Sequence, residues 1–302
     1  MLKDGLADSV VEMLHGSGFS VVDCRGFRSS FDVMGKRQDM LILVKTLANV
    51  EGLSRDGIDR MKEVSMLLGA VPLVVSCRMK SSELSDGVVY DRYGVCVTNI
   101  ATFGTIVNDA PPAVYSKRGN YCIHVNSSKL TQSRRRMGMT QVSLAKRLGV
   151  SKQSVYRYEA SGTMRLEVFE RLRGILGEDL VETEFRLERT RERKGTISSG
   201  KSTSFKTMVC REFRELGFNT ILTSAPFDLV ATGEKRVFGV VSDDWRRMGE
   251  RLSTLTHISD MVGGYTLCVS RRKVKTNVSV LSPKELAGIK TAAELFKILK
   301  GE

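Results

Sequence analysis

The sequence contains little of what metal sites, disulfide frameworks and membrane spans are built from. Its 302 residues include only three histidines, six cysteines and one tryptophan. No two cysteines have C-x-x-C spacing, which argues against zinc fingers and disulfides and favours reduced thiols. No apolar run approaches the roughly 18–20 residues that cross a membrane, and the acidic N-terminal segment is unlike a signal peptide. We therefore expect a cytoplasmic protein without membrane contact, metal or other cofactor.

Positive charge is in excess, and it is concentrated in one region. The net charge of +13 divides into −2 for residues 1–115, +9 for residues 116–195 and +6 for residues 196–302. Between Lys117 and Arg157 there are ten lysines and arginines and no acid. A localised basic surface supplies sequence-independent affinity for nucleic-acid phosphates. The alternative is a basic face that is merely solvated.

The middle of the chain has the pattern of two short helices joined by a tight turn. Thr140 is a good N-cap for a helix over residues 141–148, Gly149 supplies the turn, and Ser151 caps a second helix that runs through Glu159. The spacing predicts that one set of side chains faces inward: Leu144, Ala145, Leu148, Val150, Val155 and Tyr158. It leaves a polar set on the second helix facing outward, able to reach base edges and phosphates: Lys152, Gln153, Tyr156 and Arg157.

From Ser128 to Leu176 the chain resembles the repressor/Cro (XRE-type) helix-turn-helix family. The matching positions are Arg134, Gly138, Met139, Thr140, Gln141, Leu144, Ala145, Leu148, Gly149, Val150 and Ser151. The resemblance implies double-stranded DNA as partner, a homodimer on near-palindromic sites, and a partly buried ion pair between Arg134 and Glu159. It also implies that Gln141 bonds a backbone phosphate. The expected DNA-binding residues are Gln141, Ser151, Lys152, Gln153, Ser154, Tyr156 and Arg157, of which Lys152 and Gln153 would read bases.

As a whole, the chain resembles an archaeal family of helix-turn-helix transcriptional regulators, which have this domain in mid-chain. The resemblance rests on the length of the chain, on the position of the helix-turn-helix and on the excess of basic residues. It implies a sequence-specific transcriptional regulator. The operator, the effector and the choice between repression and activation stay open.

The two regions that flank the helix-turn-helix share an order of elements. Val10–Phe19 aligns with Val209–Phe218, and Phe31–Met34 aligns with Phe227–Val230. Three further strand-like pairs follow in the same order: Leu41–Val44 with Phe238–Val241, Leu73–Ser76 with Leu267–Ser270, and Val95–Thr98 with Val278–Leu281. A duplicated α/β domain explains this order. The alternative is the loose likeness that any two α/β segments can have.

Each flank is similar to the core of the restriction-endonuclease-like (PD-(D/E)xK) fold. Active members hold Mg²⁺ with an Asp and a second acid in a (D/E)-x-K pattern on the next strand, because hard cations need clustered carboxylates. Here Asp32 is the first acid, but Leu43 stands at the second position, two residues before Lys45. In the second flank Asp228 is followed by residues 239–241, Gly-Val-Val, with neither acid nor lysine. We therefore expect no enzyme.

Two enzymatic alternatives stay open. Glu12 or Asp39 could supply the missing acid of the first flank, which would make the protein a metal-dependent DNA nuclease targeted by the helix-turn-helix. Residues 195–202, GTISSGKS, match the phosphate-cradling P-loop of an ATPase. The charged run 184–194 before them cannot be the buried strand that a P-loop needs, so a linker is favoured.

The predicted fold class is α+β and multidomain, with a central all-α helix-turn-helix domain between two similar α/β restriction-endonuclease-like domains. The predicted boundaries are 1–115 for the first domain, 116–192 for the helix-turn-helix domain, 193–204 for a linker and 205–302 for the second α/β domain. A basic group in the last domain gives candidate phosphate contacts, with a solvated loop as the alternative: Arg271, Arg272, Lys273 and Lys275.

Overall fold

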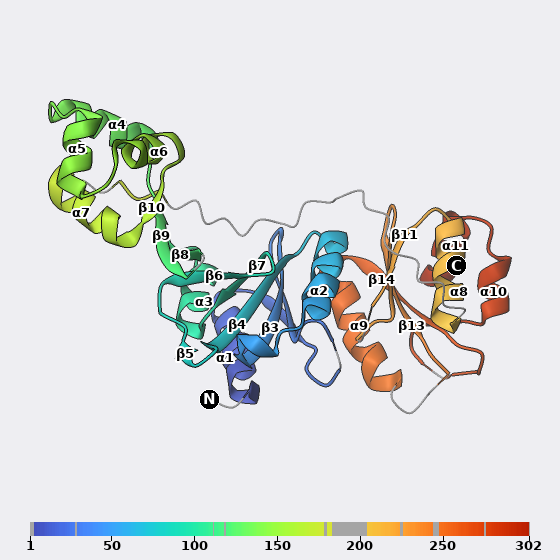
Figure 1. Ribbon diagram of the computed structural model, residues 1–302. Helices are drawn as coiled ribbons and strands as arrows, with labels where there is room; N and C mark the ends of the chain where they lie inside the picture. The colour runs from blue at the N-terminus through green and yellow to red at the C-terminus, as the bar shows by residue number, and fades with distance from the viewer. Residues whose placement is uncertain are drawn as a thin grey trace. The chain divides into compact units, whose positions relative to one another are not determined.

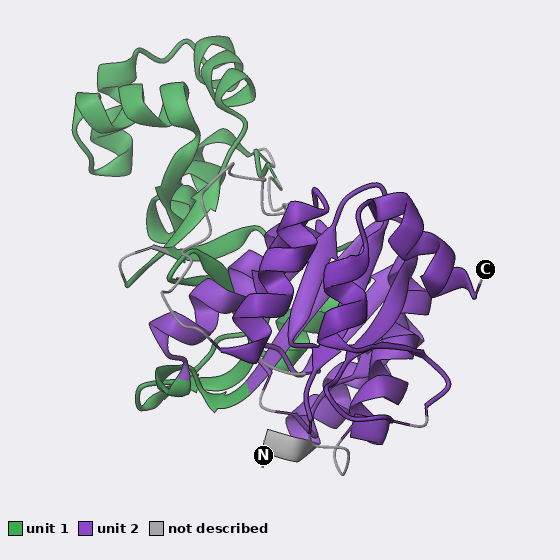
Figure 2. Ribbon diagram, turned by 90° about the vertical axis from the view of Figure 1, so that its right-hand side faces the viewer, with its two compact units in different colours: residues 1, 47–52, 74–187 green, residues 2–46, 53–73, 188–302 purple. Residues whose placement is uncertain are grey.

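The computed structural model describes residues 3–27, 29–110, 112–117, 119–177, 180–182, 204–223, 226–243, 248–274 and 276–301. The chain forms two compact units (Figure 2). Unit 1 comprises residues 1, 47–52 and 74–187, and unit 2 comprises residues 2–46, 53–73 and 188–302. Lys275 and the P-loop-like segment 195–202 lie outside the described residues.

The N-terminal part of unit 2 is a helix on a set of antiparallel strands. Its elements are α1 (Lys3–Gly16), β1 (Ser20–Asp23), β2 (Val33–Arg37), β3 (Met40–Asn49) and α2 (Arg55–Leu68). β2 pairs with β1 on one side and with β3 on the other, where Val33 lies opposite Val44. Residues 41–44 of β3 are all buried, as a continuous apolar run predicts for a strand covered on both faces.

The C-terminal part of unit 2 has three layers. Its elements are α8 (Phe205–Glu215), β11 (Asn219–Leu222), β12 (Leu229–Thr232), β13 (Arg236–Val241), α9 (Met248–Val262), β14 (Gly264–Val269), β15 (Ser279–Leu281), α10 (Pro283–Gly288) and α11 (Ala292–Lys300). The sheet follows this order from β11 to β15, antiparallel up to β13 and parallel from there. Figure 1 shows α9 on one face, and α8, α10 and α11 on the other.

One hydrophobic core joins these two parts of unit 2. It contains side chains from β1 to β3 and α2, together with side chains from β11 to β14 and α9. Phe31 and Phe227, each directly before an aspartate, have ring centroids 6.2 Å apart. The Arg236 guanidinium donates to the carbonyls of Leu68 and Val262, 3.1 Å each, at the ends of α2 and α9. A cation at a helix C-terminus satisfies carbonyls that have no partner within the helix.

Unit 1 combines a sheet with the helix-turn-helix. Its sheet elements and their companions are η1 (Val50–Gly52), β4 (Val71–Met79), β5 (Ser82–Glu83), β6 (Val88–Arg92), β7 (Val95–Thr98), α3 (Ile100–Val107), β8 (Val114–Lys117) and β9 (Asn120–His124). The strands are ordered β4-β7-β6-β8-β9-β10, and β5 pairs with β4. Asn99 caps α3 by accepting a hydrogen bond from Thr102 N–H at 2.9 Å.

The helical part of unit 1 consists of α4 (Ser127–Arg136), α5 (Gln141–Leu148), α6 (Lys152–Ser161) and α7 (Leu166–Leu176), with β10 (Thr163–Arg165) between the last two. α5 coincides with the predicted helix, and α6 runs two residues beyond the predicted end at Glu159. The prediction that this domain is all-α is wrong, because β10 pairs with β9. Gly162 permits this strand: its φ of +68° turns the chain out of α6, and a Cβ there would lie 2.3 Å from the Val125 carbonyl oxygen.

The helix-turn-helix has its own core. The inward set predicted from the sequence is in it: Leu144, Ala145, Leu148 and Val155 are buried, and Val150 and Tyr158 pack against them. Side chains of β9, α4, β10 and α7 also belong to this core. Within the described part of the chain, no helix is both long enough and apolar enough to span a membrane.

Candidate nucleic-acid interface

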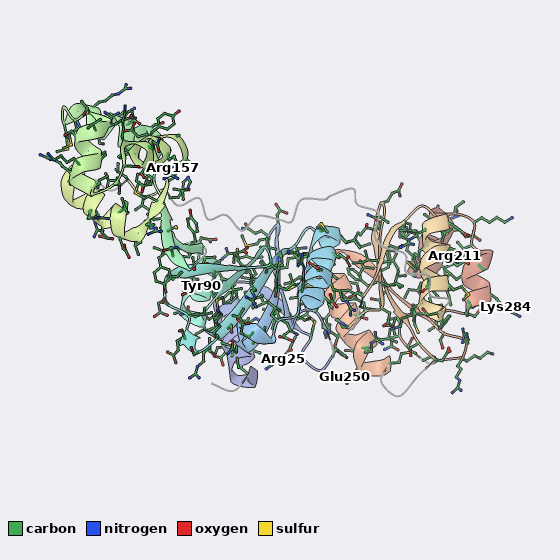
Figure 3. All side chains as sticks on the ribbon, in the orientation of Figure 1. Arg25, Tyr90, Arg157, Arg211, Glu250 and Lys284 are labelled. Atoms are coloured by element: carbon green, nitrogen blue, oxygen red, sulfur yellow. The ribbon has the colours of Figure 1, made fainter. Side chains whose placement is uncertain are left out.

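The first turn of α6 is fixed by its cap and leaves a polar face in solvent. The Ser151 side chain accepts a hydrogen bond from Ser154 N–H at 3.1 Å, which holds the start of the helix as the sequence predicts. Arg157 donates to the Ser154 hydroxyl at 3.3 Å. The predicted outward set is exposed: Lys152, Gln153, Tyr156 (63%) and Arg157, the last labelled in Figure 3. This face combines an amide, cations and an aromatic ring, the groups that contact base edges and phosphates.

A buried ion pair ties α4 to α6. Arg134 Nε lies 2.5 Å from Glu159 Oε1, and Arg134 Nη2 lies 3.1 Å from Glu159 Oε2. Both side chains are at least nine-tenths buried. The second terminal nitrogen of Arg134 donates to the Met139 carbonyl at 2.7 Å, so the guanidinium also fixes the loop before α5. Burial alone would raise the pKa of Glu159, but hydrogen bonds from Arg134 and Gln141 hold it below its usual range.

Gln141 belongs to the same network. Its Nε2 donates to Glu159 Oε2 at 2.7 Å. Because an amide nitrogen carries two N–H groups, this bond leaves one donor for a phosphate oxygen. The structure thus brings together Arg134, Glu159 and Gln141, while Lys152, Gln153 and Arg157 lie on the exposed face of α6.

Two features of this region escaped the sequence prediction. Val142, next to Gln141 on α5, is 58% exposed. An apolar side chain at an outward helical position is the signal that could have indicated a contact there. The second feature is the bond between His124 Nδ1 and the Thr163 hydroxyl, 3.2 Å long, which joins β9 to β10 directly after α6. Its sequence signal is weak, because β10 has only three residues.

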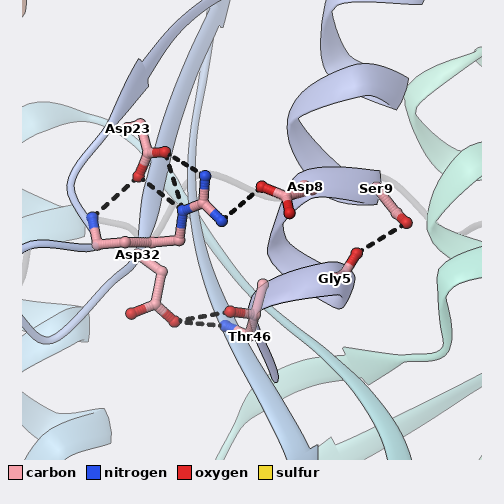
Figure 4. A network of polar contacts seen from close by, with 7 residues as sticks. Gly5, Asp8, Ser9, Asp23, Asp32 and Thr46 are labelled. Atoms are coloured by element: carbon pink, nitrogen blue, oxygen red, sulfur yellow. Dashed lines mark hydrogen bonds and ion pairs between the residues drawn. The ribbon is translucent and has the colours of Figure 1, made fainter. Parts of the chain in front are cut away.

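The first acid of the nuclease-like pattern is held by protein donors. Asp32 Oδ1 lies 2.8 Å from Lys45 Nζ. Its Oδ2 accepts from the backbone N–H and the hydroxyl of Thr46, at 2.8 and 2.9 Å (Figure 4). Leu43, which stands where the second acid would be, is fully buried. A divalent cation needs clustered carboxylate oxygens, so this donor set does not fit Mg²⁺.

A second pair of carboxylates nearby shares one arginine. Arg25 lies between Asp8 of α1 and Asp23 of β1, with 2.6 Å from a guanidinium nitrogen to each carboxylate. Both aspartates are labelled in Figure 4. Burial would raise the pKa of Asp23, but the hydrogen bonds and charge of Arg25 outweigh it and hold that pKa below its usual range. Asp39 cannot supply the missing acid, because it lies in the β2–β3 turn, roughly 15 Å along the strands from Asp32.

The corresponding position of the C-terminal part has the same backbone pattern and different partners. Asp228 N–H donates to the Gly239 carbonyl at 2.8 Å, as Asp32 N–H does to Val44. Asp228 Oδ2 accepts from Val241 N–H at 2.9 Å. Among the described residues, the cations Lys206 and Arg251 contact its Oδ1 and no second carboxylate joins it, so this site does not fit Mg²⁺ either. Among the described residues, no cluster of three or more His, Cys, Asp or Glu could hold a metal ion.

Comparison with known protein families finds a match for the helix-turn-helix and another for the N-terminal region that contains Asp32. Residues 3–112 match the family model of a PD-(D/E)XK superfamily domain, and residues 130–182 match that of a helix-turn-helix. No solved structure matches the chain.

Among the relatives that match nearly the whole chain are three archaeal proteins, each named as a putative HTH-type transcriptional regulatory protein. Those of Pyrococcus horikoshii and Methanocaldococcus jannaschii are 29% and 27% identical, over 99% of this chain and 98% and 97% of their own. That of Archaeoglobus fulgidus is 29% identical over 98% of this chain and 97% of its own. The chain thus carries an XRE-type helix-turn-helix at residues 130–182 and a PD-(D/E)XK superfamily domain at residues 3–112, within a whole-chain likeness to these archaeal proteins.

Proposed function

We propose that this protein is a sequence-specific double-stranded DNA-binding transcriptional regulator. The observation that carries the proposal is the exposed polar face of α6, which a buried network of Arg134, Glu159 and Gln141 fixes to α4 and α5. A rigid recognition helix keeps its side chains in register with base edges. The match to the helix-turn-helix model and the names of the relatives support the same function.

The proposal assigns base reading to Lys152 and Gln153, and general affinity to Gln141. The test begins with a genome-wide map of bound sites and with expression measured after deletion of the gene. On a site found in this way, Gln153→Ala should cost about 1–3 kcal/mol and relax the preference at one base pair. Gln141→Ala should weaken binding to all sequences alike. An unchanged ranking of sequences in Gln153→Ala would refute its role in base reading.

We further propose that the protein acts as a homodimer. One recognition helix reads only a few base pairs, and two-fold pairing places a second helix on a half-site about 34 Å away along the same face of the duplex. The mass of the protein, measured free and on DNA by light scattering, tests this. A monomeric mass in both states contradicts it.

We also propose that the two α/β regions share one fold. Support comes from the matching strand order of β1–β3 and β11–β13, and from the equivalent backbone bonds of Asp32 and Asp228. An experimental structure tests this by superposition of the strands in residues 1–110 and 203–300. These regions would supply dimerisation, effector sensing or further DNA contact.

A metal-dependent nuclease is the second candidate function. The observations that favour it are the PD-(D/E)XK match and the 2.8 Å pair of Asp32 with Lys45. We nevertheless propose that the protein is no enzyme, because Leu43 supplies no ligand and the Asp32 oxygens are taken by protein donors. Cleavage of duplex or branched DNA with Mg²⁺ or Mn²⁺, abolished in Asp32→Ala, would overturn this.

A further inference from the structure

The edge of the C-terminal sheet at which β13 and β14 end carries charged groups outside the helix-turn-helix. Asp228 lies at this edge, since its Oδ2 accepts from Val241 N–H at the last residue of β13. Asp243 and Arg271 follow β13 and β14, and the Arg271 backbone N–H donates to the Asp243 carboxylate at 2.8 Å. The carboxyl ends of parallel strands are where open α/β sheets bind ligands.

Two cations share the single carboxylate of Asp228. Lys206 Nζ lies 2.6 Å and Arg251 Nη2 2.9 Å from Asp228 Oδ1, while the carboxylate itself is almost fully buried. One carboxylate balances only one of these charges. Lys206 is 45% exposed, and Arg251 Nη2 is buried without an acceptor in hydrogen-bond geometry among the described residues. Lys206 Nζ can therefore donate to an anion that approaches from solvent, and the buried Arg251 adds positive charge close to it.

Further cations extend this site. The Arg271 guanidinium lies 4.3 Å from the ring centroid of Phe205, the residue before Lys206. Arg272 and Lys273 follow it and are exposed. We name these five side chains the basic edge: Lys206, Arg251, Arg271, Arg272 and Lys273. Against them the described contacts place two carboxylates, Asp228 and Asp243, so the basic edge keeps a positive excess.

The equivalent carboxylate in the N-terminal part is paired differently. Among the described contacts, Asp32 is paired with the single cation Lys45, whereas Asp228 is paired with two cations. A second cation at the carboxylate adds to the attraction for an anionic ligand. The two positions of one chain therefore differ in the charge that surrounds the aspartate.

We propose that the basic edge binds the phosphodiester backbone of duplex DNA, with cations where an active nuclease of this fold would hold metal. The proposal rests on the proposed DNA-binding function and adds a second contact surface in the C-terminal region. Lysine and arginine on phosphate oxygens position a protein on DNA without reading its sequence. The basic edge thus supplies affinity, and α6 supplies specificity.

The test compares two double variants of the full chain that lose the same charge. Arg272→Ala/Lys273→Ala removes exposed cations of the basic edge. Lys235→Ala/Lys297→Ala is the control; both lysines are exposed, and Lys235 lies at the opposite edge, where it contacts Tyr265 of β14. The measured quantity is the affinity for a random-sequence DNA duplex at salt concentrations between about 0.05 and 0.2 M. The duplex has about 60 base pairs, which is several helical turns. The basic-edge variant should bind roughly 10–30-fold more weakly at about 0.15 M salt, and its log–log salt slope should fall by about 2.

A third variant, Lys152→Ala/Arg157→Ala, separates this proposal from the proposed function. If it weakens binding while the basic-edge variant behaves like the control, the basic edge is no DNA contact and the helix-turn-helix function stands. If only the basic-edge variant weakens binding, the proposed role of α6 fails instead. Inorganic phosphate is the remaining probe. Stabilisation of the wild type by phosphate, lost in the basic-edge variant without any change in DNA affinity, would make the edge a free-anion site and overturn the proposal.

Discussion

Removal of Arg134 should unfold the helix-turn-helix locally. Arg134 makes two hydrogen bonds to Glu159 and one to the Met139 carbonyl, and both members of the pair are at least nine-tenths buried. In Arg134→Ala the Glu159 carboxylate keeps the bond from Gln141 and the charge of Arg135 but loses its paired counter-charge. An uncompensated buried charge costs about 3–5 kcal/mol.

Amide hydrogen exchange of the full chain, followed by mass spectrometry, measures this loss in α4 and α6 directly. A loss of about 3–5 kcal/mol corresponds to exchange faster by roughly two to three and a half orders of magnitude, at about 1.4 kcal/mol per factor of ten. Lys129→Ala is the matched control, because Lys129 lies on the same helix, is exposed and is not among the groups that lower the pKa of Glu159. The double variant Arg134→Met/Glu159→Leu should lose less stability than Arg134→Ala, because it leaves no buried charge.

The reasoning is refuted if Arg134→Ala exchanges like Lys129→Ala. If Arg134→Ala keeps its protection but binds DNA more weakly, Arg134 is a phosphate contact and not part of the scaffold. The double variant gives an independent check: a loss as large as that of Arg134→Ala would mean that the side-chain volume matters and the charge does not.

Three further predictions concern other contacts. Gly162→Ala should destabilise the helix-turn-helix, because a Cβ there meets the Val125 carbonyl oxygen at 2.3 Å. Gly174→Ala, in the open interior of α7, should instead stabilise it by about 0.5–1 kcal/mol. Amide-exchange protection of α6 and α7 measures both effects. The pKa of Glu159 is lowered in the folded state. The stability that ionised Glu159 contributes is therefore complete above its ordinary pKa near 4.5 and is lost as pH falls through its pKa in the folded protein. The exchange protection of α6, followed as the pH is lowered, should show this loss in the wild type and not in Glu159→Gln. Arg236→Met should lower the stability of unit 2 by about 1–3 kcal/mol in urea unfolding, since the carbonyls at the ends of α2 and α9 lose their donor.

Local sequence signals were sufficient for the helices of the helix-turn-helix. Thr140 and Ser151 cap α5 and α6, and Gly149 has the left-handed φ of +68° that its turn requires. These signals act within one helical turn, so neighbouring residues carry them completely. They failed at Gly162, where the chain enters β10. The partner of that strand is β9, about forty residues earlier, and a three-residue strand has no pattern of its own.

The sequence by itself determined which residue types stand around the two aspartates. The missing acid at Leu43 follows from residue identity, and the strands near Asp32 and Asp228 follow from apolar runs. Only the tertiary structure decided which cations pair with each aspartate. Lys45 reaches Asp32 from the neighbouring strand, whereas Asp228 meets cations from α8 and α9, more than twenty residues away in either direction. Charge balance in a buried site depends on distances between elements, and packing sets those distances.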